Sequence, residues 1–126
     1  MILETIQISQ NATLTAILHG ASEEMQSDSA LRRPAVVICP GGAYEFCSVR
    51  ESDAPASAFL NMGLQVFILL YSCGEAAGGK QPLAEAAQSV RLVRERADEW
   101  WIDPQKILIC GFSAGGHLAA SLGVHW

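Results

Sequence analysis

Alternating and continuous apolar stretches divide the chain into predicted strands. Residues 3–9 and 13–18 alternate between apolar and polar side chains, which predicts two antiparallel strands at a half-exposed sheet edge. Residues 35–39, 65–71 and 106–110 are instead almost continuously apolar. Such runs are typical of strands that are buried on both faces of a parallel sheet.

Two longer segments have the three- and four-residue apolar spacing of helices. Residues 52–62 predict one helix, and residues 82–101 predict the longest one. A turn is expected at residues 103–104, and a helix of small residues follows residue 113. Aperiodic, glycine-containing or polar stretches predict loops at residues 20–33, 40–50 and 72–81.

This order of elements predicts an α/β fold. Two hairpin-like strands precede an alternation of strand and helix, which builds a mostly parallel sheet with flanking helices. In such sheets chemistry gathers beyond the carboxyl ends of the strands. Both glycine-rich loops, residues 40–44 and 111–115, follow carboxyl ends.

Composition narrows the class of protein. Half of the 126 residues are hydrophobic, which is enough for a core. A net charge of −5, with no basic cluster beyond Arg32-Arg33, argues against nucleic-acid binding. The first ten residues have no signal-peptide pattern, and the longest apolar run, residues 66–71, is too short for a bilayer. We therefore expect a soluble cytoplasmic protein that has no membrane association.

The four cysteines give no sign of a metal site. Cys39, Cys47, Cys73 and Cys110 lack the C-x-x-C spacing of metal ligands. Cys39 and Cys110 end apolar strands and are interpreted as small buried hydrophobes. A structural disulfide is not expected in a reducing compartment.

The most informative stretch is Gly111-Phe112-Ser113-Ala114-Gly115, which joins an apolar strand to a helix. A serine at the apex of such a turn is the arrangement called a nucleophile elbow. Glycines two residues before and after the serine avoid collisions in the strained turn. The free N–H groups at the start of the following helix favour negative charge near Ser113. The alternative interpretation is a glycine-rich turn with an incidental serine.

Three stretches resemble the esterase/lipase group of the α/β-hydrolases, and within it the acetyl-xylan-type carbohydrate esterases. They are Cys39-Pro40-Gly41-Gly42-Ala43-Tyr44, Gly111-Phe112-Ser113-Ala114-Gly115-Gly116-His117, and the helix that joins them with Asp103-Pro104. The resemblance implies an α/β-hydrolase fold of which residues 1–126 form a single, incomplete domain. We expect this N-terminal half to reach through the elbow, with the C-terminal part missing.

The resemblance also implies an oxyanion hole. By position, the backbone N–H groups of Gly42, Ala43 and Ala114 would hold the oxyanion. Pro40 and Ala43 depart from the family's H-G-G-G motif, but backbone donation survives both changes. Tyr44 is a candidate substrate contact, or packs beneath the loop. No cofactor and no metal are implied.

The implied reaction is hydrolysis of short-chain acyl (acetyl) esters, including acetylated carbohydrates, through an acyl-enzyme on Ser113. The family order is serine, then Asp or Glu, then His. The thirteen residues after Ser113 contain no Asp or Glu, so the triad is incomplete. His117 is interpreted as a packed or hydrogen-bonded helix residue, and His19 and His125 are less suited to act as the base.

Two alternatives stay open. A non-catalytic hydrolase-like fragment or pseudo-enzyme would only bind or assemble, and a serine peptidase of prolyl-oligopeptidase type would share the elbow. We also expect the 126-residue chain alone to be inactive. The strand at residues 106–110 should lack a partner on one side, which predicts marginal stability or a homo-oligomer formed through that sheet edge.

Overall fold

A five-stranded mixed sheet with the strand order β1-β2-β4-β3-β5 runs through the molecule. The computed structural model describes residues 1–20 and 31–125. The loop expected at residues 20–33 therefore falls largely outside the described residues. The strands are β1 (Ile2–Ser9), β2 (Ala12–Leu18), β3 (Arg33–Cys39), β4 (Gln65–Leu70) and β5 (Ile102–Gly111).

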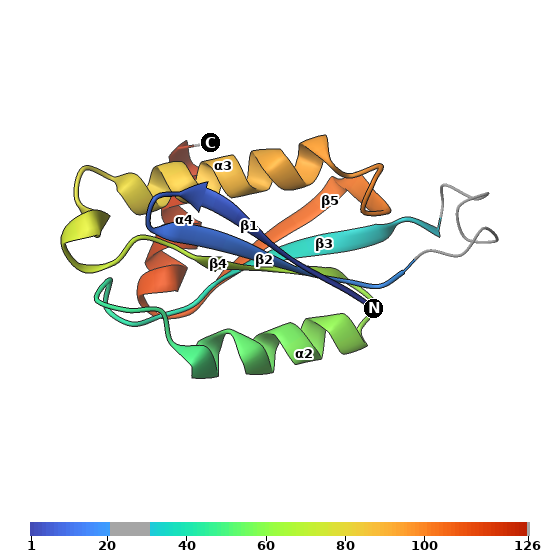
Figure 1. The fold of residues 1–126 in the computed structure, drawn as a ribbon, viewed down its shortest axis with the longest axis horizontal. Coiled ribbons are helices and arrows are strands. Elements are labelled where there is room, and N and C mark those ends of the chain that lie inside the picture. The colour runs from blue at the N-terminus through green and yellow to red at the C-terminus, as the bar shows by residue number, and fades with distance from the viewer. Residues whose placement is uncertain (21–30, 126) are drawn as a thin grey trace.

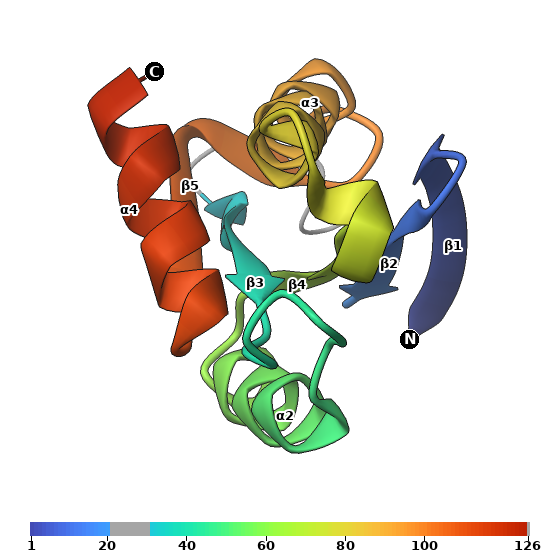
Figure 2. The same ribbon diagram turned by 90° about the vertical axis from the view of Figure 1, so that its left-hand side faces the viewer.

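Helices cover both faces of this sheet (Figures 1 and 2). They are α2 (Asp53–Asn61), α3 (Gln81–Glu95) and α4 (Ala114–His125), with two short 3₁₀ helices, η2 (Val49–Glu51) and η3 (Gly74–Ala77). Figure 2 shows α3 and α4 on one side of the strands and α2 on the other. No helix within residues 1–20 and 31–125 has the length and apolar character needed to cross a bilayer.

Burial of β3 on both faces explains its continuous apolar run. Ala35, Val37 and Cys39 belong to the core cluster that includes α3 and α4 side chains. The alternate residues Val36 and Ile38 belong to the cluster beneath α2. Successive side chains of a strand point to opposite faces, so a strand between two helical layers needs apolar residues at every position.

The predicted strand pairing is confirmed. β1 and β2 are antiparallel, and β2 continues antiparallel onto β4. β3 pairs in parallel with both β4 and β5. Within the described residues β5 is therefore an edge strand, and Leu108 on it is 52% exposed.

The longest helix is shorter than the sequence predicts. The apolar stripe continues to residue 101, but α3 ends at Glu95. The chain then turns through Trp101, which has a positive φ of 56°, and Ile102 N–H donates to Ala97 O at 2.8 Å. Ala97 and Trp100 stay buried throughout. The apolar spacing thus persists through a turn that is not helical.

Two other boundaries also differ. β5 begins at Ile102, before the turn expected at residues 103–104. That turn is a bulge within β5, because Arg33 pairs with Ile102 whereas Ala35 already pairs with Ile107. Gln105 N–H donates to the Asp103 side chain at 2.9 Å within this bulge. The loop expected at residues 72–81 contains η3.

The segments that follow β3, β4 and β5 gather at one end of the sheet, the left-hand end in Figure 1. Glu85 of α3 helps to anchor this end, because its carboxylate is buried and accepts four hydrogen bonds. The donors are Ser9 Oγ, the N–H and Oγ of Ser72, and Gln81 Nε2. A buried carboxylate needs such partners to offset its lost hydration. Glu85 therefore ties β1 and the end of β4 to α3.

We expect Glu85→Ala to lower the free energy of unfolding by about 2–4 kcal/mol, because it leaves several buried donors without an acceptor. Glu95→Ala on the exposed face of the same helix is the matched control and should change it by less than about 0.5 kcal/mol. Urea unfolding followed by circular dichroism measures both. Equal effects of the two substitutions would contradict this role for Glu85.

Candidate active site

Ser113 lies at the apex of the turn between β5 and α4, where the backbone is strained. Its φ of 54° is in the left-handed region, which costs a non-glycine residue on the order of 1–3 kcal/mol. Hydrogen bonds hold the turn: Phe112 N–H donates to Cys39 O at 3.2 Å, and Gly115 N–H to Phe112 O at 2.9 Å. The Ser113 side chain is exposed at the start of a twelve-residue helix. This is the geometry of a nucleophile elbow.

The two glycines around the serine are required by close backbone contacts, as the sequence predicts. A Cβ atom on Gly111 would lie 2.0 Å from Gly115 O. A Cβ atom on Gly115 would lie 1.9 Å from Cys39 O at the end of β3. No side chain fits at either position, so α4 can start directly against the ends of β3 and β5.

The glycine-rich loop after β3 lies beside the serine. A Cβ atom on Gly41 would be 3.0 Å from Ser113 Cβ and 2.7 Å from Phe112 O. The loop then turns sharply, because Gly42, Ala43 and Tyr44 have successive φ angles of 140°, 57° and 63°. The structure thus brings both glycine-rich loops together at one end of the sheet.

The N–H groups singled out from the sequence have no partner in the described part of the chain. Gly42, Ala43 and Ala114 make no hydrogen bond through their backbone nitrogens to residues 1–20 or 31–125. Ala114 is the first residue of α4, and Gly42 and Ala43 directly follow Gly41, which lies beside Ser113. Unpaired N–H groups at a helix N-terminus favour a bound anion.

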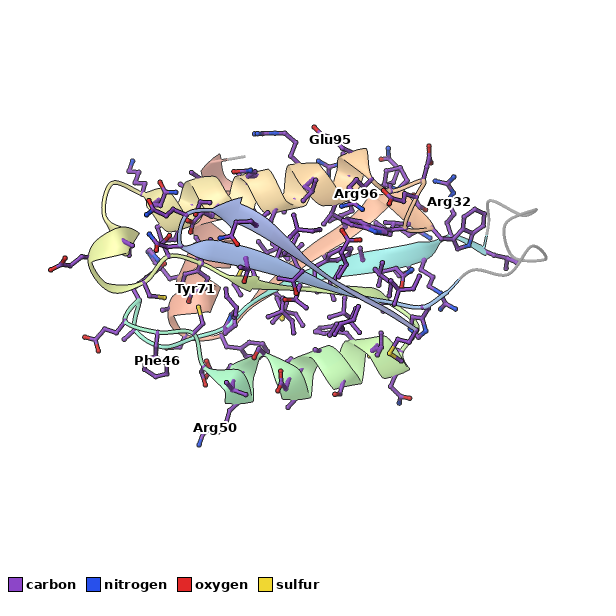
Figure 3. All side chains as sticks on the ribbon, in the orientation of Figure 1. Arg32, Phe46, Arg50, Tyr71, Glu95 and Arg96 are labelled. Carbon is purple, nitrogen blue, oxygen red and sulfur yellow. The ribbon has the colours of Figure 1, made fainter. Side chains whose placement is uncertain are left out.

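Four contacts that sequence reasoning missed hold the loop in its conformation. Glu51 Oε2 accepts the Gly41 N–H at 2.7 Å, and Gly41 O accepts Ser48 N–H at 2.8 Å. The Tyr71 hydroxyl donates to Pro40 O, and Gly74 N–H donates to Tyr44 O at 2.6 Å. Figure 3 shows Tyr71 at this end of the sheet. The sequence gives no signal for these pairings, because the partners approach only in the folded chain.

No described histidine ring is hydrogen-bonded to the Ser113 side chain, and His117 contacts Ser113 through the backbone, where its N–H donates to Ser113 O at 3.0 Å. His117 Nδ1 is 2.7 Å from the Tyr44 hydroxyl, and the two rings meet edge to face. His117 is therefore a hydrogen-bonded helix residue, as expected. His19 lies after β2, where its Nε2 is 2.9 Å from Leu60 O, at the amino end of the parallel strands. The side chain of His125 is outside the described residues.

A pocket of about 520 Å³ opens beside the Tyr44–His117 pair. Leu118 and Ser121 of α4 line one side, and the segment from η3 to the start of α3 lines the other. Partial burial raises the pKa of the Tyr44 hydroxyl, which favours its protonated form further. Among the described residues, no three His, Cys, Asp or Glu side chains are grouped to hold a metal ion.

The BD-FAE family model matches residues 22–125. The chain belongs to the BD-FAE family. It is 36% identical over 99 residues to endo-1,4-beta-xylanase B of Butyrivibrio fibrisolvens, covering 76% of this chain and 16% of that protein. It is 38% identical over 88 residues to an acetylxylan esterase of Xylanibacter ruminicola, covering 68% of this chain and 18% of that protein. The BD-FAE chain thus spans less than a fifth of each curated relative.

Solved structures show that the BD-FAE chain has an α/β-hydrolase fold. An α/β-hydrolase enzyme from a Medee basin deep-sea metagenome library superposes with a TM-score of 0.89 at 41% identity, covering 97% of this chain and 50% of that one. An acetyl ester-xyloside bifunctional hydrolase from Caldicellulosiruptor lactoaceticus superposes with a TM-score of 0.83 at 27% identity, covering 97% of this chain and 47% of that one. The chain therefore corresponds to about half of the fold in these structures.

We expect Gly115→Ala to lower the free energy of unfolding by about 3 kcal/mol or more, because the new methyl group meets rigid backbone at Cys39. Gly123→Ala in the same helix is the matched control. Its Cβ would meet open space, so it should raise stability by about 0.5–1 kcal/mol through helix propensity. Urea unfolding of both variants measures the change in the free energy of unfolding. A change of the same sign in both variants would contradict the close contact at Gly115.

Proposed function

We propose that this chain carries the nucleophile and oxyanion-binding part of a serine carboxylic-ester hydrolase that acts on short acyl esters such as acetylated carbohydrates. The observation that carries the proposal is the strained, exposed Ser113 beside a loop with unpaired N–H groups. The substrate class is supported by two similar proteins, of which one is named an acetylxylan esterase and the other an acetyl ester-xyloside bifunctional hydrolase.

In the proposed reaction Ser113 Oγ attacks the ester carbonyl and forms a tetrahedral intermediate. The N–H groups of Gly42, Ala43 and Ala114 receive the negative charge on the carbonyl oxygen. The alcohol then leaves with a proton, and water hydrolyses the acyl-enzyme to release the acid. Such donors accelerate the reaction because they are already oriented before charge develops, and each is worth roughly 10²–10³ in rate.

The proton of Ser113 requires a base, and His117 is a poor candidate for it. Its Nδ1 is already paired with Tyr44, and it lies one helical turn after the serine. We propose that the histidine and its orienting acid are not among these 126 residues. The 126-residue chain by itself is then inactive.

Tyr44 is proposed as a substrate contact. It directly follows residues 40–43, the proposed oxyanion loop, and lines the 520 Å³ pocket together with His117. The pocket wall is largely apolar, and Tyr44 and His117 are among its polar lining residues. A short acyl group or the ring of a sugar would find both a nonpolar surface and a hydrogen-bonding group there.

The nucleophile is tested in a chimera that joins residues 1–126 to the remaining half of the 41%-identical metagenome α/β-hydrolase. We expect the chimera to hydrolyse p-nitrophenyl acetate and Ser113→Ala to reduce kcat/KM by about 10³-fold or more. The 126-residue chain alone should give the same rate as its own Ser113→Ala variant. The intact metagenome enzyme is the positive control.

Three results would contradict the proposal. Turnover by the folded chimera that survives Ser113→Ala would exclude Ser113 as the nucleophile. Turnover by the 126-residue chain that vanishes in Ser113→Ala would mean that a base reaches the serine from within the chain or from a second copy. Cleavage of a peptide substrate in preference to the acetyl ester would indicate a serine peptidase and not an esterase.

Glu51 is expected to act by positioning the oxyanion loop. In the chimera, Glu51→Ala should lower kcat about 10- to 100-fold and leave KM within about twofold, because the loss falls on the transition state. Glu51→Gln keeps an acceptor oxygen for Gly41 N–H and should recover part of the rate. The control is Glu45→Ala, since Glu45 is exposed on the turn that follows Gly42. A raised KM with unchanged kcat would contradict this role.

A further inference from the structure

Two cysteines from different loops meet behind the oxyanion loop. Cys47 follows the turn after β3, and Cys73 follows β4 at the start of η3. Their Sγ atoms are 3.7 Å apart, although the residues are 26 positions apart in sequence. We propose that Cys47 and Cys73 form a redox site that closes reversibly into a disulfide by exchange with small-molecule disulfides.

The surroundings already hold the two thiols in a paired arrangement. Both point at one carbonyl, Tyr71 O, which lies 3.3 Å from Cys73 Sγ and 3.7 Å from Cys47 Sγ. A disulfide bond is about 2.05 Å long, so the sulfurs must approach by less than 2 Å, a distance that side-chain rotation covers. The free thiols satisfy their hydrogen-bonding capacity at Tyr71, and the disulfide gives up only these weak S–H contacts.

A small reagent can reach this pair. Both cysteines are half-buried and line an open pocket of about 460 Å³, together with Phe46, Leu70 and Ala76. Phe46 projects to the surface in Figure 3. Cys39, in contrast, is fully buried in β3. The geometry therefore selects one pair among the four cysteines.

The exchange balances without any other reactant. The Cys73 thiolate attacks one sulfur of the disulfide RSSR and releases one thiolate RS⁻, which takes up the proton that Cys73 lost. Cys47, once deprotonated, attacks Cys73 Sγ and releases the second RS⁻, which is protonated in turn. Two protein thiols are oxidised by two electrons in total, and RSSR is reduced to two RSH.

The environments of the two thiols agree with this order. Burial raises the pKa of Cys47 to about 12. Burial also raises the pKa of Cys73, but the hydrogen bond with Cys47 works in the opposite direction and stabilises its thiolate. Cys73 is thus the better first nucleophile and Cys47 the resolving thiol. Because both pKa values are raised, exchange at neutral pH is slow.

The bond would join two of the segments that hold the oxyanion loop. Cys47 precedes Ser48, whose N–H donates to Gly41 O, and Cys73 lies two residues after Tyr71, whose hydroxyl donates to Pro40 O. The proposed disulfide therefore stiffens the loop from behind. Formation of the bond itself does not depend on esterase activity.

The test is incubation of the 126-residue chain with oxidised glutathione, followed by thiol blocking and peptide mapping under non-reducing conditions. We expect the Cys47–Cys73 link to exceed every other pairing by about tenfold or more, because proximity raises its effective concentration. The same incubation in urea should remove this preference. Reduction with dithiothreitol should restore four free thiols.

Three variants complete the test. Cys47→Ser should leave Cys73 as a stable mixed disulfide with glutathione, and Cys73→Ser should prevent the link. Cys110→Ser, on β5, should leave the link unchanged. A pairing pattern that is the same with and without urea, a link to Cys39 or Cys110, or mixed disulfides alone in the unsubstituted chain would each overturn the proposal.

Discussion

The contact between the start of α4 and the end of β3 governs the rest of the site. Gly115 presses its backbone so closely on Cys39 O that a single methyl group would not fit. Because both partners are backbone, neither can move aside as a flexible side chain would. This contact places Ser113 next to Gly41 and sets the direction in which α4 leaves the sheet. The relation between the serine and the proposed oxyanion loop is thus fixed by backbone packing.

Three of the five non-glycine residues with a positive φ among the described residues lie at this site. Ser113, Ala43 and Tyr44 all have positive φ angles without being glycine. Conformations of this kind persist only where surrounding contacts impose them. Here Glu51, Tyr71 and the N–H of Gly74 hold the loop from outside its own sequence. Strained backbone with dedicated supports is typical of sites that are organised before a ligand binds.

The sequence predicted those parts of the molecule whose signals are local. Alternating and continuous apolar stretches identified the strands, and helical apolar spacing identified α2 and α3. The spacing of glycines around Ser113 identified the elbow, and the small residues after it identified α4. The end of α3 could not be predicted, since Ala97 and Trp100 continue the apolar stripe through a non-helical turn. The roles of Glu51 and Tyr71 depend on tertiary contacts that leave no pattern in the chain. The Cys47–Cys73 contact is of the same kind.

The two halves of the proposed chemistry place different demands on a sequence. Stabilising an oxyanion needs backbone N–H groups, which nearly every residue has. It therefore requires only the right backbone conformation, and glycines at a few positions can specify this conformation. Removing the proton of the serine needs an imidazole within hydrogen-bonding reach of Oγ, and the ring of His117 is paired with Tyr44 instead. Ser113 is exposed and its backbone is already held on both sides. A base can therefore complete the proposed site by approaching the open side of the serine, without any rearrangement of the elbow or of the oxyanion loop.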